Sequence, residues 1–151
     1  MVAGGVADAD LRGAVPADAD DVAALLTELG YPCDVDDAAQ RISIVAHDER
    51  QALLVSRAQG RISGLLALDF MYYLPLDAMT CRITALVIAP DAQRQGLGRW
   101  LLREAERRAR LGGAARIELT SAAQRTDAHA FYRACGYAES SLRFVKPLGD
   151  S

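Results

Sequence analysis

The sequence predicts a single domain of the α/β or α+β class, built around a mixed β-sheet. The chain has 151 residues, a length that suits one domain. Apolar residues make up 51% of it and charged residues 25%, the balance of a globular chain with a buried core. Strand-like and helix-like stretches alternate, with an early hairpin and a later strand–helix–strand unit. We therefore expect one domain over residues 1–151, with an ordered core at about 10–148.

The first third of the chain is expected to hold a short strand and two helices. An apolar stretch at 11–15 precedes Pro16-Ala17-Asp18, an acidic turn that suits the positive end of a helix dipole. Gly30 lies near the expected end of this first helix. A second helix is expected over 36–46, although its β-branched residues make this assignment ambiguous.

The middle of the chain favours strands. Residues 51–58 and 61–73 predict a hairpin that turns at Gln59-Gly60. Residues 81–89 predict another strand, rich in β-branched side chains, which Pro90 ends.

The last third returns to a mixed pattern. Over 96–111 the apolar residues recur at helical spacing, until Gly112-Gly113 stops the helix. A strand at 116–121, a short helix at 126–135 and a final strand at 141–146 complete the expected fold.

Charge is unevenly distributed along the chain, although the formal net charge is only −3. Residues 1–50 carry eleven acids and three arginines, whereas residues 91–116 carry seven arginines and three acids. Each cluster is either a solvated face or a binding surface for an oppositely charged partner. The acidic cluster would bind a cation, and the basic cluster would bind an anion. The acidic balance disfavours general nucleic-acid binding, which needs a basic face.

The cysteines and the N-terminus indicate a cytoplasmic protein. Cys33, Cys81 and Cys135 are odd in number and form no CxxC or Cys/His metal-ligand pattern, so we expect reduced thiols and no metal site. The first residues lack the basic and apolar regions of a secretory signal, and no apolar run is long enough to cross a bilayer.

The segment Gln93-Arg94-Gln95-Gly96-Leu97-Gly98 opens the helix expected over 96–111. The first N–H groups of a helix lack intrahelical partners and carry partial positive charge, so this position suits a phosphate. Its glycines allow a close approach, and the arginines at 94 and 99 can add charge-assisted hydrogen bonds. A Rossmann fingerprint needs a third glycine and a P-loop needs Gly-Lys-Ser/Thr, so neither fits. A glycine turn without a ligand is the alternative.

The stretch LVIAPDAQRQGLGRWLL, which contains this loop, resembles the acetyl-CoA signature of the GNAT superfamily of N-acetyltransferases, a strand followed by Gln/Arg-x-x-Gly-x-Gly/Ala. The stretch RTDAHAFYRACGY, residues 125–137, resembles the superfamily's second landmark, a helix with Phe/Tyr-Tyr that ends in Gly-Phe/Tyr. The order of elements also matches over nearly the whole chain. The resemblance implies a mixed, mostly antiparallel sheet of about six or seven strands, flanked by about four helices and splayed at the acetyl-CoA site.

The same resemblance implies acetyl-CoA as the cosubstrate, with no metal. The end of the strand before the glycine loop would pair with the pantetheine amides, and the loop would hold the diphosphate. Arg125 stands where many members have Asn and could reach the phosphates. The residues assigned to acetyl-CoA are Leu86, Val87, Ile88, Arg94, Gln95, Gly96, Leu97, Gly98, Arg99 and Arg125.

Tyr132 matches the tyrosine that protonates the departing CoA thiolate in many members, a step for which a phenol is a suitable donor. A core aromatic beside Phe131 is the alternative reading of this residue. His129 shares a helix face with Tyr132 and is either a structural hydrogen-bonding residue or a catalyst.

The general base is less evident. Many relatives carry a glutamate on the strand before the splay, where this chain reads Arg82-Ile83-Thr84-Ala85. Glu118 on the following strand is the best substitute, with an exposed carboxylate as the alternative. Asp69, Tyr72 and Tyr73 border the expected acceptor cleft and could act through water.

The function implied by the resemblance is acetyl transfer from acetyl-CoA to a primary amine by direct attack in a ternary complex. The acceptor would be a small molecule or a peptide, and the acidic first third suggests a cationic one. The alternative is a non-catalytic acyl-CoA-binding or regulatory module that kept the cofactor site and lost its base. An acetyltransferase directed at nucleic acid is disfavoured, and no nucleic-acid or membrane partner is expected. Relatives often form dimers, so a homodimer fits the family.

Overall fold

The computed structural model describes residues 9–120 and 126–149. The chain divides into two compact units, Met1–Thr120 and Ser121–Ser151, and each is described by itself. Within the described ranges, none of the helices combines the length and the apolar character that crossing a bilayer requires.

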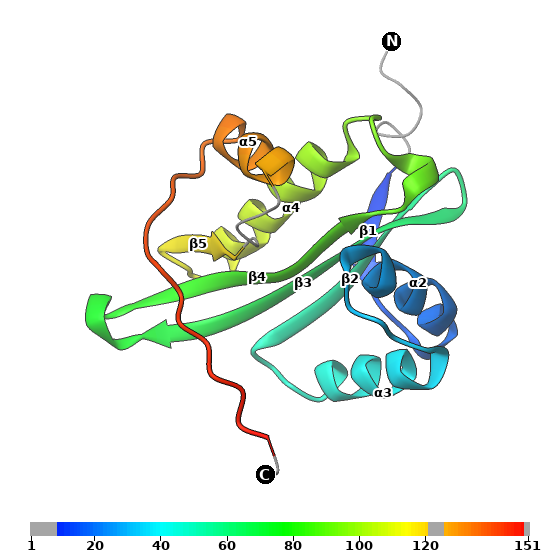
Figure 1. Cartoon of the computed structure of the whole chain (residues 1–151), viewed down its shortest axis with the longest axis horizontal. Coiled ribbons are helices and arrows are strands. Elements are labelled where there is room, and N and C mark those ends of the chain that lie inside the picture. The colour runs from blue at the N-terminus through cyan, green and yellow to red at the C-terminus, as the bar shows by residue number, and fades with distance from the viewer. Residues whose placement is uncertain (1–8, 121–125, 150–151) are drawn as a thin grey trace. The chain divides into compact units, whose positions relative to one another are not determined.

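The first unit is a five-stranded sheet in the spatial order β1-β2-β3-β4-β5 (Figure 1). Neighbouring strands run antiparallel as far as β4, and β5 runs parallel to β4. The strand bounds are Asp10–Gly13, Gln51–Ala58, Arg61–Tyr73, Ala78–Ile88 and Arg116–Leu119. The hairpin predicted at 51–58 and 61–73 is confirmed. Its turn residues, Gln59 and Gly60, have φ of 57° and 77°, as a two-residue hairpin turn requires.

Three α-helices lie in the described part of this unit. A short 3₁₀ turn at Pro16–Asp18 leads into α2 (Ala19–Leu29), which ends at Gly30 in a left-handed conformation. The second helix, α3 (Val35–Ala46), is a helix as expected, because Asp34 caps it by accepting a hydrogen bond from the Asp37 amide at 2.8 Å. The third is α4 (Leu97–Leu111).

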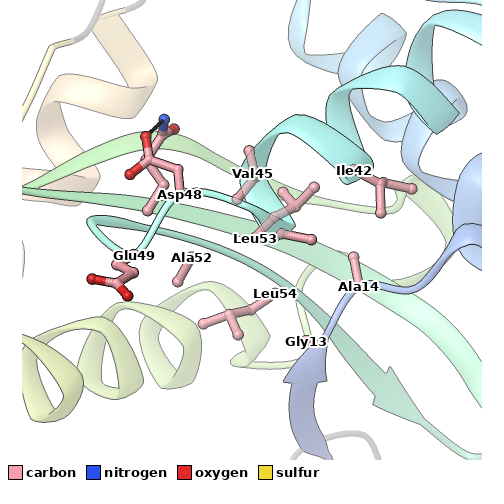
Figure 2. A pocket seen from close by; sticks show the side chains of 11 residues that line it. Gly13, Ala14, Ile42, Val45, Asp48, Glu49, Ala52, Leu53 and Leu54 are labelled. Carbon is pink, nitrogen blue, oxygen red and sulfur yellow. Dashed lines mark hydrogen bonds between the residues drawn. The ribbon is translucent and has the colours of Figure 1, made fainter.

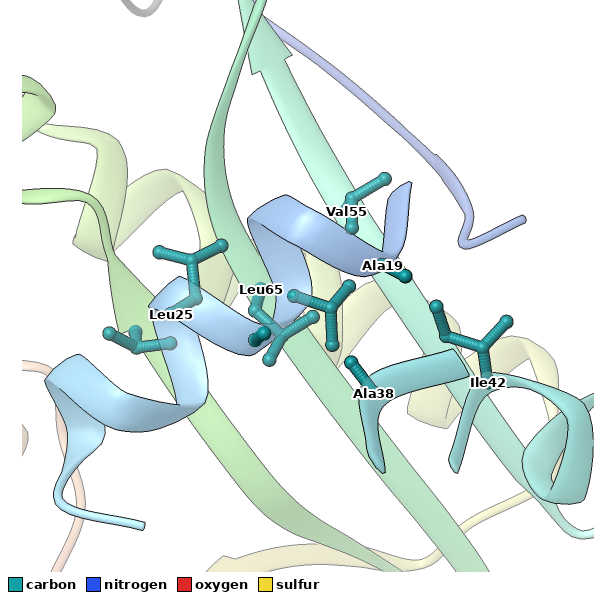
Figure 3. Close-up of a cluster of buried hydrophobic side chains, with 9 residues drawn as sticks. Ala19, Leu25, Ala38, Ile42, Val55 and Leu65 are labelled. Atoms are coloured by element: carbon teal, nitrogen blue, oxygen red, sulfur yellow. The ribbon is translucent and has the colours of Figure 1, made fainter. Parts of the chain in front are cut away.

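The sheet is covered on both faces. Residues two apart on a strand share a face, so Val55, Leu65 and Val87 lie on one side, where α2 and α3 pack. Figure 3 shows Leu25 and Ile42 of these helices directed at this part of the sheet. The alternate residues, such as Leu66, lie on the other side, which α4 covers (Figure 1).

The second unit contains α5 (Thr126–Ala134) and the C-terminal segment. The helix ends in a turn at Gly136, whose φ is 94°, and the Tyr137 amide donates to the Tyr132 carbonyl at 3.0 Å. This is the helix-to-Gly-Tyr turn expected from the second sequence motif.

The strand count is where the prediction fails. The sequence predicts about six or seven strands, whereas the described residues form five. The missing strand is the one expected at 141–146, which has no regular structure. Its apolar side chains are exposed, with Leu142 at 79% and Phe144 at 90%. A β-strand is stable when a neighbour satisfies its backbone groups, and no strand within the described ranges pairs with this segment.

Candidate active site

The strand β4 has an open edge over its last residues. On one side, β3 pairs with it as far as the Gly64–Ile88 register. On the other side, β5 pairs with it only as far as Ile83–Leu119. From Thr84 to Ile88, therefore, no strand of the described chain covers the second side of β4. The open edge lies at the end of β4 where the family resemblance implies a splay, and it arises here because β5 ends at Leu119.

The backbone groups that face this open edge follow from the alternation of a strand. The Ala89 amide donates to the Ser63 carbonyl, toward β3, at 2.8 Å. Backbone groups of successive residues point to opposite sides, so those of Leu86 and Ile88 face away from β3. The Ile88 carbonyl indeed accepts a hydrogen bond from the Gln93 side chain at 3.2 Å. The open edge thus offers backbone donors and acceptors to an extended ligand that carries amides.

The loop that follows β4 has the conformation of an anion cradle. Arg94 and Gly96 both have positive φ, 66° and 79°. The left-handed conformation of Arg94 costs about 1 kcal/mol and is of the kind that concentrates at functional sites. Gly96 is the N-cap of α4, and the first hydrogen bond of the helix runs from the Trp100 amide to the Gly96 carbonyl at 3.1 Å. The amides of residues 97–99 consequently lack intrahelical partners, as at any helix start.

The charge at this helix start favours an anion. The first turn of α4 contains no acidic residue that would neutralise the helix dipole. Arg94 and Arg99 are exposed there, as are Gln95 and Gly96. The helix itself is held in place by buried side chains along its inner face, namely Leu97, Leu101, Leu102, Ala105 and Ala109. A fixed, positively charged helix N-terminus of this kind suits a phosphate group.

A hollow of about 350 Å³ lies at the bulge in β4. The register moves from Ala67–Ala85 to Leu68–Ile83, so Thr84 is the extra residue. The described residues that line the hollow are Leu26, Leu29, Tyr31, Pro32, Arg41, Thr84 and Ala85. One of these side chains is charged, that of Arg41 on α3, and no acid of the described chain forms an ion pair with it.

A larger hollow, of about 400 Å³, lies away from this edge, between α3 and the strands β1 and β2 (Figure 2). Apolar side chains such as Val45 and Leu53 form much of its wall. Its polar residues include Asp48 and Gln51, which are hydrogen-bonded to each other at 2.8 Å. The smaller hollow is the better acceptor candidate, because it adjoins the open edge and contains a cation without an ion-pair partner in the described ranges.

Beyond the bulge, a polar cluster occupies the same sheet face. It consists of Asp69, Thr80, Arg82, Arg116 and Glu118, from β3, β4 and β5, and we refer to it as the strand cluster. Asp69, Arg82 and Glu118 stand on one rung of the sheet, and Thr80 and Arg116 stand on the next. The rung of Asp69 follows directly on that of Ala67 and Ala85, and Ala85 lines the hollow.

Within the strand cluster, both oxygens of Glu118 are engaged. Oε1 accepts from Arg82 Nη2 at 2.6 Å and Nε at 2.8 Å, and Oε2 accepts from Arg116 Nη2 at 3.1 Å. Arg116 is itself held by Thr80, whose Oγ1 accepts from its Nε at 3.3 Å, and by the Tyr73 ring, 4.6 Å from its guanidinium carbon. Glu118 is therefore fixed between two guanidinium groups.

Asp69 has the opposite environment. Its Oδ1 is buried and has no hydrogen-bond partner among the described residues. A buried acceptor without a hydrogen-bond donor costs about 1–3 kcal/mol, so a donor on a bound ligand would be stabilised at this oxygen.

The cysteine behind this surface is not a nucleophile. Burial raises the pKa of the Cys81 thiol to about 11, and the negative charge of Asp69 adds to the effect. The thiol is thus protonated near neutral pH, and Cys81 acts as a packing residue.

The second unit holds the expected acid. Tyr132 packs edge-on against Phe131 and Tyr137, with ring centroids 5.4 Å and 6.2 Å away. Its backbone carbonyl closes the turn after α5, which fixes the residue within the unit. His129 lies on the same helix and is half-buried. Arg125 falls outside the described residues.

Several acidic residues in the first third of the chain stabilise the local structure. Asp18 is buried and ion-paired with Arg12 at 2.8 Å, Asp34 caps α3, and Asp48 bonds to the neighbouring turn. Because these acids have structural contacts, the acidic first third of the chain is weaker evidence for a cationic acceptor.

Sequence reasoning did not single out Arg41 or Arg116, and it noted Arg82 only as a place without a carboxylate. Arg82 left a signal, because an arginine inside a strand of otherwise β-branched and small residues is a charge at a position where burial is expected. Arg41 left none, because its place at the bulge depends on how α3 packs.

Comparison with known proteins decides the family. The model of the Acetyltransferase (GNAT) family matches residues 20–137. The chain belongs to the GNAT acetyltransferase family. An aminoalkylphosphonate N-acetyltransferase from Salmonella typhimurium is 34% identical over 141 residues, which cover 92% of this chain and 91% of that protein. This GNAT protein is thus an enzyme, an N-acetyltransferase that moves an acetyl group to an amine. The family implies acetyl-CoA as cosubstrate, and the comparisons do not favour a non-catalytic module.

Solved structures agree on the GNAT fold. A transcriptional regulator from Bacillus halodurans has a TM-score of 0.84 at 23% identity, covering 93% of this chain and 99% of its own. A GNAT family acetyltransferase from Staphylococcus aureus has a TM-score of 0.80 at 24% identity, with the same coverage. At these identities the likeness concerns the fold.

Proposed function

We propose that this N-acetyltransferase acetylates a small primary amine that also carries a phosphonate or similar anionic group. The amine attacks acetyl-CoA directly, in a ternary complex. The observation that carries the proposal is the 34% identity, over nearly the whole chain, to an aminoalkylphosphonate N-acetyltransferase.

The hollow at the β4 bulge supports an anionic acceptor. Arg41 offers a guanidinium group, which binds the oxygens of a phosphonate through paired, charge-assisted hydrogen bonds. The hydroxyl of Thr84 is a further donor at the same bulge. A doubly charged acceptor of a few carbon atoms suits a hollow of about 350 Å³.

For acetyl-CoA we propose the edge and loop already described. The backbone from Leu86 to Ile88 binds the pantetheine amides, and the amides and side chains at 94–99 bind the diphosphate, with Arg125 as a further phosphate ligand. The open edge and the unneutralised helix N-terminus support this assignment. Tyr132 is the proposed acid that protonates the leaving thiolate. Two carboxylates, Glu118 and Asp69, are candidates for the base.

Thiol release from acetyl-CoA, measured with a panel of amines, tests the acceptor. We expect 2-aminoethylphosphonate to be used with a much higher kcat/KM than ethylamine, which has the same carbon skeleton without the anion. Cadaverine and a short peptide represent the cationic and peptide acceptors. Preference for either of these over the phosphonate would contradict the anionic class, while still leaving an acetyltransferase.

Calorimetric titration with acetyl-CoA tests the cofactor loop. The Gly96→Glu variant places a negative charge at the helix N-terminus and should weaken acetyl-CoA binding about tenfold or more. Gly60→Glu is the matched control, because Gly60 has nearly the same φ, 77° against 79°, and lies in the β2–β3 turn. Equal affinity in the two variants, or equal binding of ATP and acetyl-CoA by the unmodified chain, would argue against the assignment.

A further inference from the structure

We infer that Asp69 is the catalytic base that removes the proton from the acceptor ammonium, and that Glu118 is a positioning residue. The inference rests on the proposed function, since it concerns the same acceptor site. It reverses the priority that the sequence suggests, in which Glu118 is the leading base.

Glu118 is poorly placed to collect a proton. A base must present a free lone pair to the group that it deprotonates. Both oxygens of Glu118 accept hydrogen bonds from guanidinium N–H groups at 2.6–3.1 Å, so its lone pairs are largely engaged by Arg82 and Arg116. Instead, Glu118 holds Arg82 and Arg116 in place on adjacent rungs of the sheet. Together Glu118, Arg82 and Arg116 carry one net positive charge.

Asp69 meets the requirement. Its Oδ1 has an unused lone pair, is shielded from water and has no hydrogen-bond partner among the described residues. It stands one rung, about 7 Å along the strand, from the Ala67–Ala85 pair, of which Ala85 lines the hollow. An acceptor held at its anionic end by Arg41 can therefore extend its amine along the sheet face toward Asp69.

The groups around Asp69 are compatible with this role. Across the sheet it faces Arg82 on one side and Gln51 on the other, with Glu118 and Arg116 beyond Arg82. The Gln51 amide donates to Asp48, and Arg82 donates to Glu118. Cys81, on the opposite face, carries no charge near neutral pH. Among the described residues no group donates to Asp69 Oδ1, so this oxygen is available to an acceptor ammonium.

The proton balance of the step is complete. The ammonium gives one proton to Asp69, and the neutral amine attacks the thioester carbonyl carbon, so that a C–N bond forms and the C–S bond breaks. The thiolate takes a proton from Tyr132, the proposed donor. The nitrogen releases its second proton to solvent, and the Tyr132 phenolate takes one back from solvent. Asp69 then releases its proton to water. The products are the N-acetyl compound, free CoA thiol and one proton.

The test compares Asp69→Asn and Glu118→Gln by pH profiles of kcat and KM on the best acceptor of the amine panel. For Asp69→Asn we expect kcat to fall about 10²–10⁴-fold near pH 7. The loss should shrink as the pH rises toward the pKa of the acceptor amine, because water then supplies the neutral amine. For Glu118→Gln we expect a higher acceptor KM and little change in kcat. Acetyl-CoA affinity should be unchanged in both.

Asp10→Asn is the matched control, since it removes one carboxylate from an exposed strand position. Asp69→Ala supplies an independent reading, because added formate should restore part of its turnover if the carboxylate acts as a base, and a purely structural aspartate would give no such rescue. An active chain whose Asp69→Asn variant keeps its kcat at every pH would overturn this inference alone. A chain that releases thiol with none of the amines would overturn the proposed function and the inference together.

Discussion

Gly64 on β3 is expected to be intolerant of any side chain, and its substitution should disturb both stability and cofactor binding. It pairs with Ile88 at the end of β4. A Cβ at this position would lie 2.8 Å from Ser56 Oγ, 3.0 Å from Ile88 Cδ1 and 3.0 Å from the Val87 carbonyl oxygen. Two of these atoms belong to the segment that forms the open edge.

The expected loss of stability follows from these short distances. Overpacking of this kind costs about 1–3 kcal/mol in free energy of unfolding. At about 2–4 °C per kcal/mol for a chain of this size, Gly64→Ala should lower Tm by roughly 2–12 °C. Relief of the clash requires β4 to move by a few tenths of an ångström, and each backbone hydrogen bond to acetyl-CoA weakened by that shift should raise Kd about two- to tenfold.

Thermal and urea unfolding measure the stability, and calorimetry with acetyl-CoA measures Kd. Gly13→Ala is the control, because a Cβ on Gly13 of β1 meets nothing within 4 Å. It should be neutral or stabilising by about 0.4–1 kcal/mol, through the lower entropy of the unfolded chain. If Gly64→Ala matched Gly13→Ala in both stability and Kd, the proposed coupling between this packing contact and the open edge would be refuted.

The remaining predictions concern stability. The hydrogen bond from Arg12 lowers the pKa of Asp18, against the opposing effect of burial. Its stabilisation is therefore full above about pH 4 and is lost as the pH falls through the lowered pKa of the folded state. Asp18→Asn should cost about 1–3 kcal/mol at pH 7 and progressively less in acid, measured by urea unfolding across a pH series. A constant difference over that series would contradict the linkage. Leu101, fully buried in α4, should cost about 2.7–5 kcal/mol when changed to Ala, and a loss below 1 kcal/mol would mean that α4 is not packed on the sheet.

Local patterns predict much of this fold, and non-local pairing accounts for what they miss. The hairpin around Gln59-Gly60 was predictable because its turn residues and its flanking alternation are contiguous in the sequence. The start of α4 was predictable from Gly96 for the same reason. The segment at 141–146 shows the limit. Its apolar residues fit a strand, but a strand is stable only when it pairs with a neighbouring strand. A local sequence pattern does not show whether such a neighbour is present.

The candidate site divides in the same way. The glycine loop and the open edge are continuous with β4, so one sequence motif indicates both. The ion pair of Glu118 with Arg82 arises from the parallel register of β4 and β5, which no local spacing reveals, whereas Arg116 and Glu118 lie two residues apart on one strand. The unpaired oxygen of Asp69 is equally a product of tertiary structure. Sequence alone identifies the carboxylates near the site, and the structure is needed to distinguish their surroundings.

The order of strands in the sheet also has a consequence for how this protein is made. Because β1 to β5 lie side by side in the order in which they are synthesised, each new strand finds its neighbour already present on the ribosome. Strand pairing can therefore proceed without waiting for distant sequence, which favours rapid folding. One face remains uncovered until α4 emerges, since Leu66 and Leu68 are buried in the finished fold on the side of that helix. Only residues 89–96 separate β4 from α4, so the covering helix follows soon after β4 is complete.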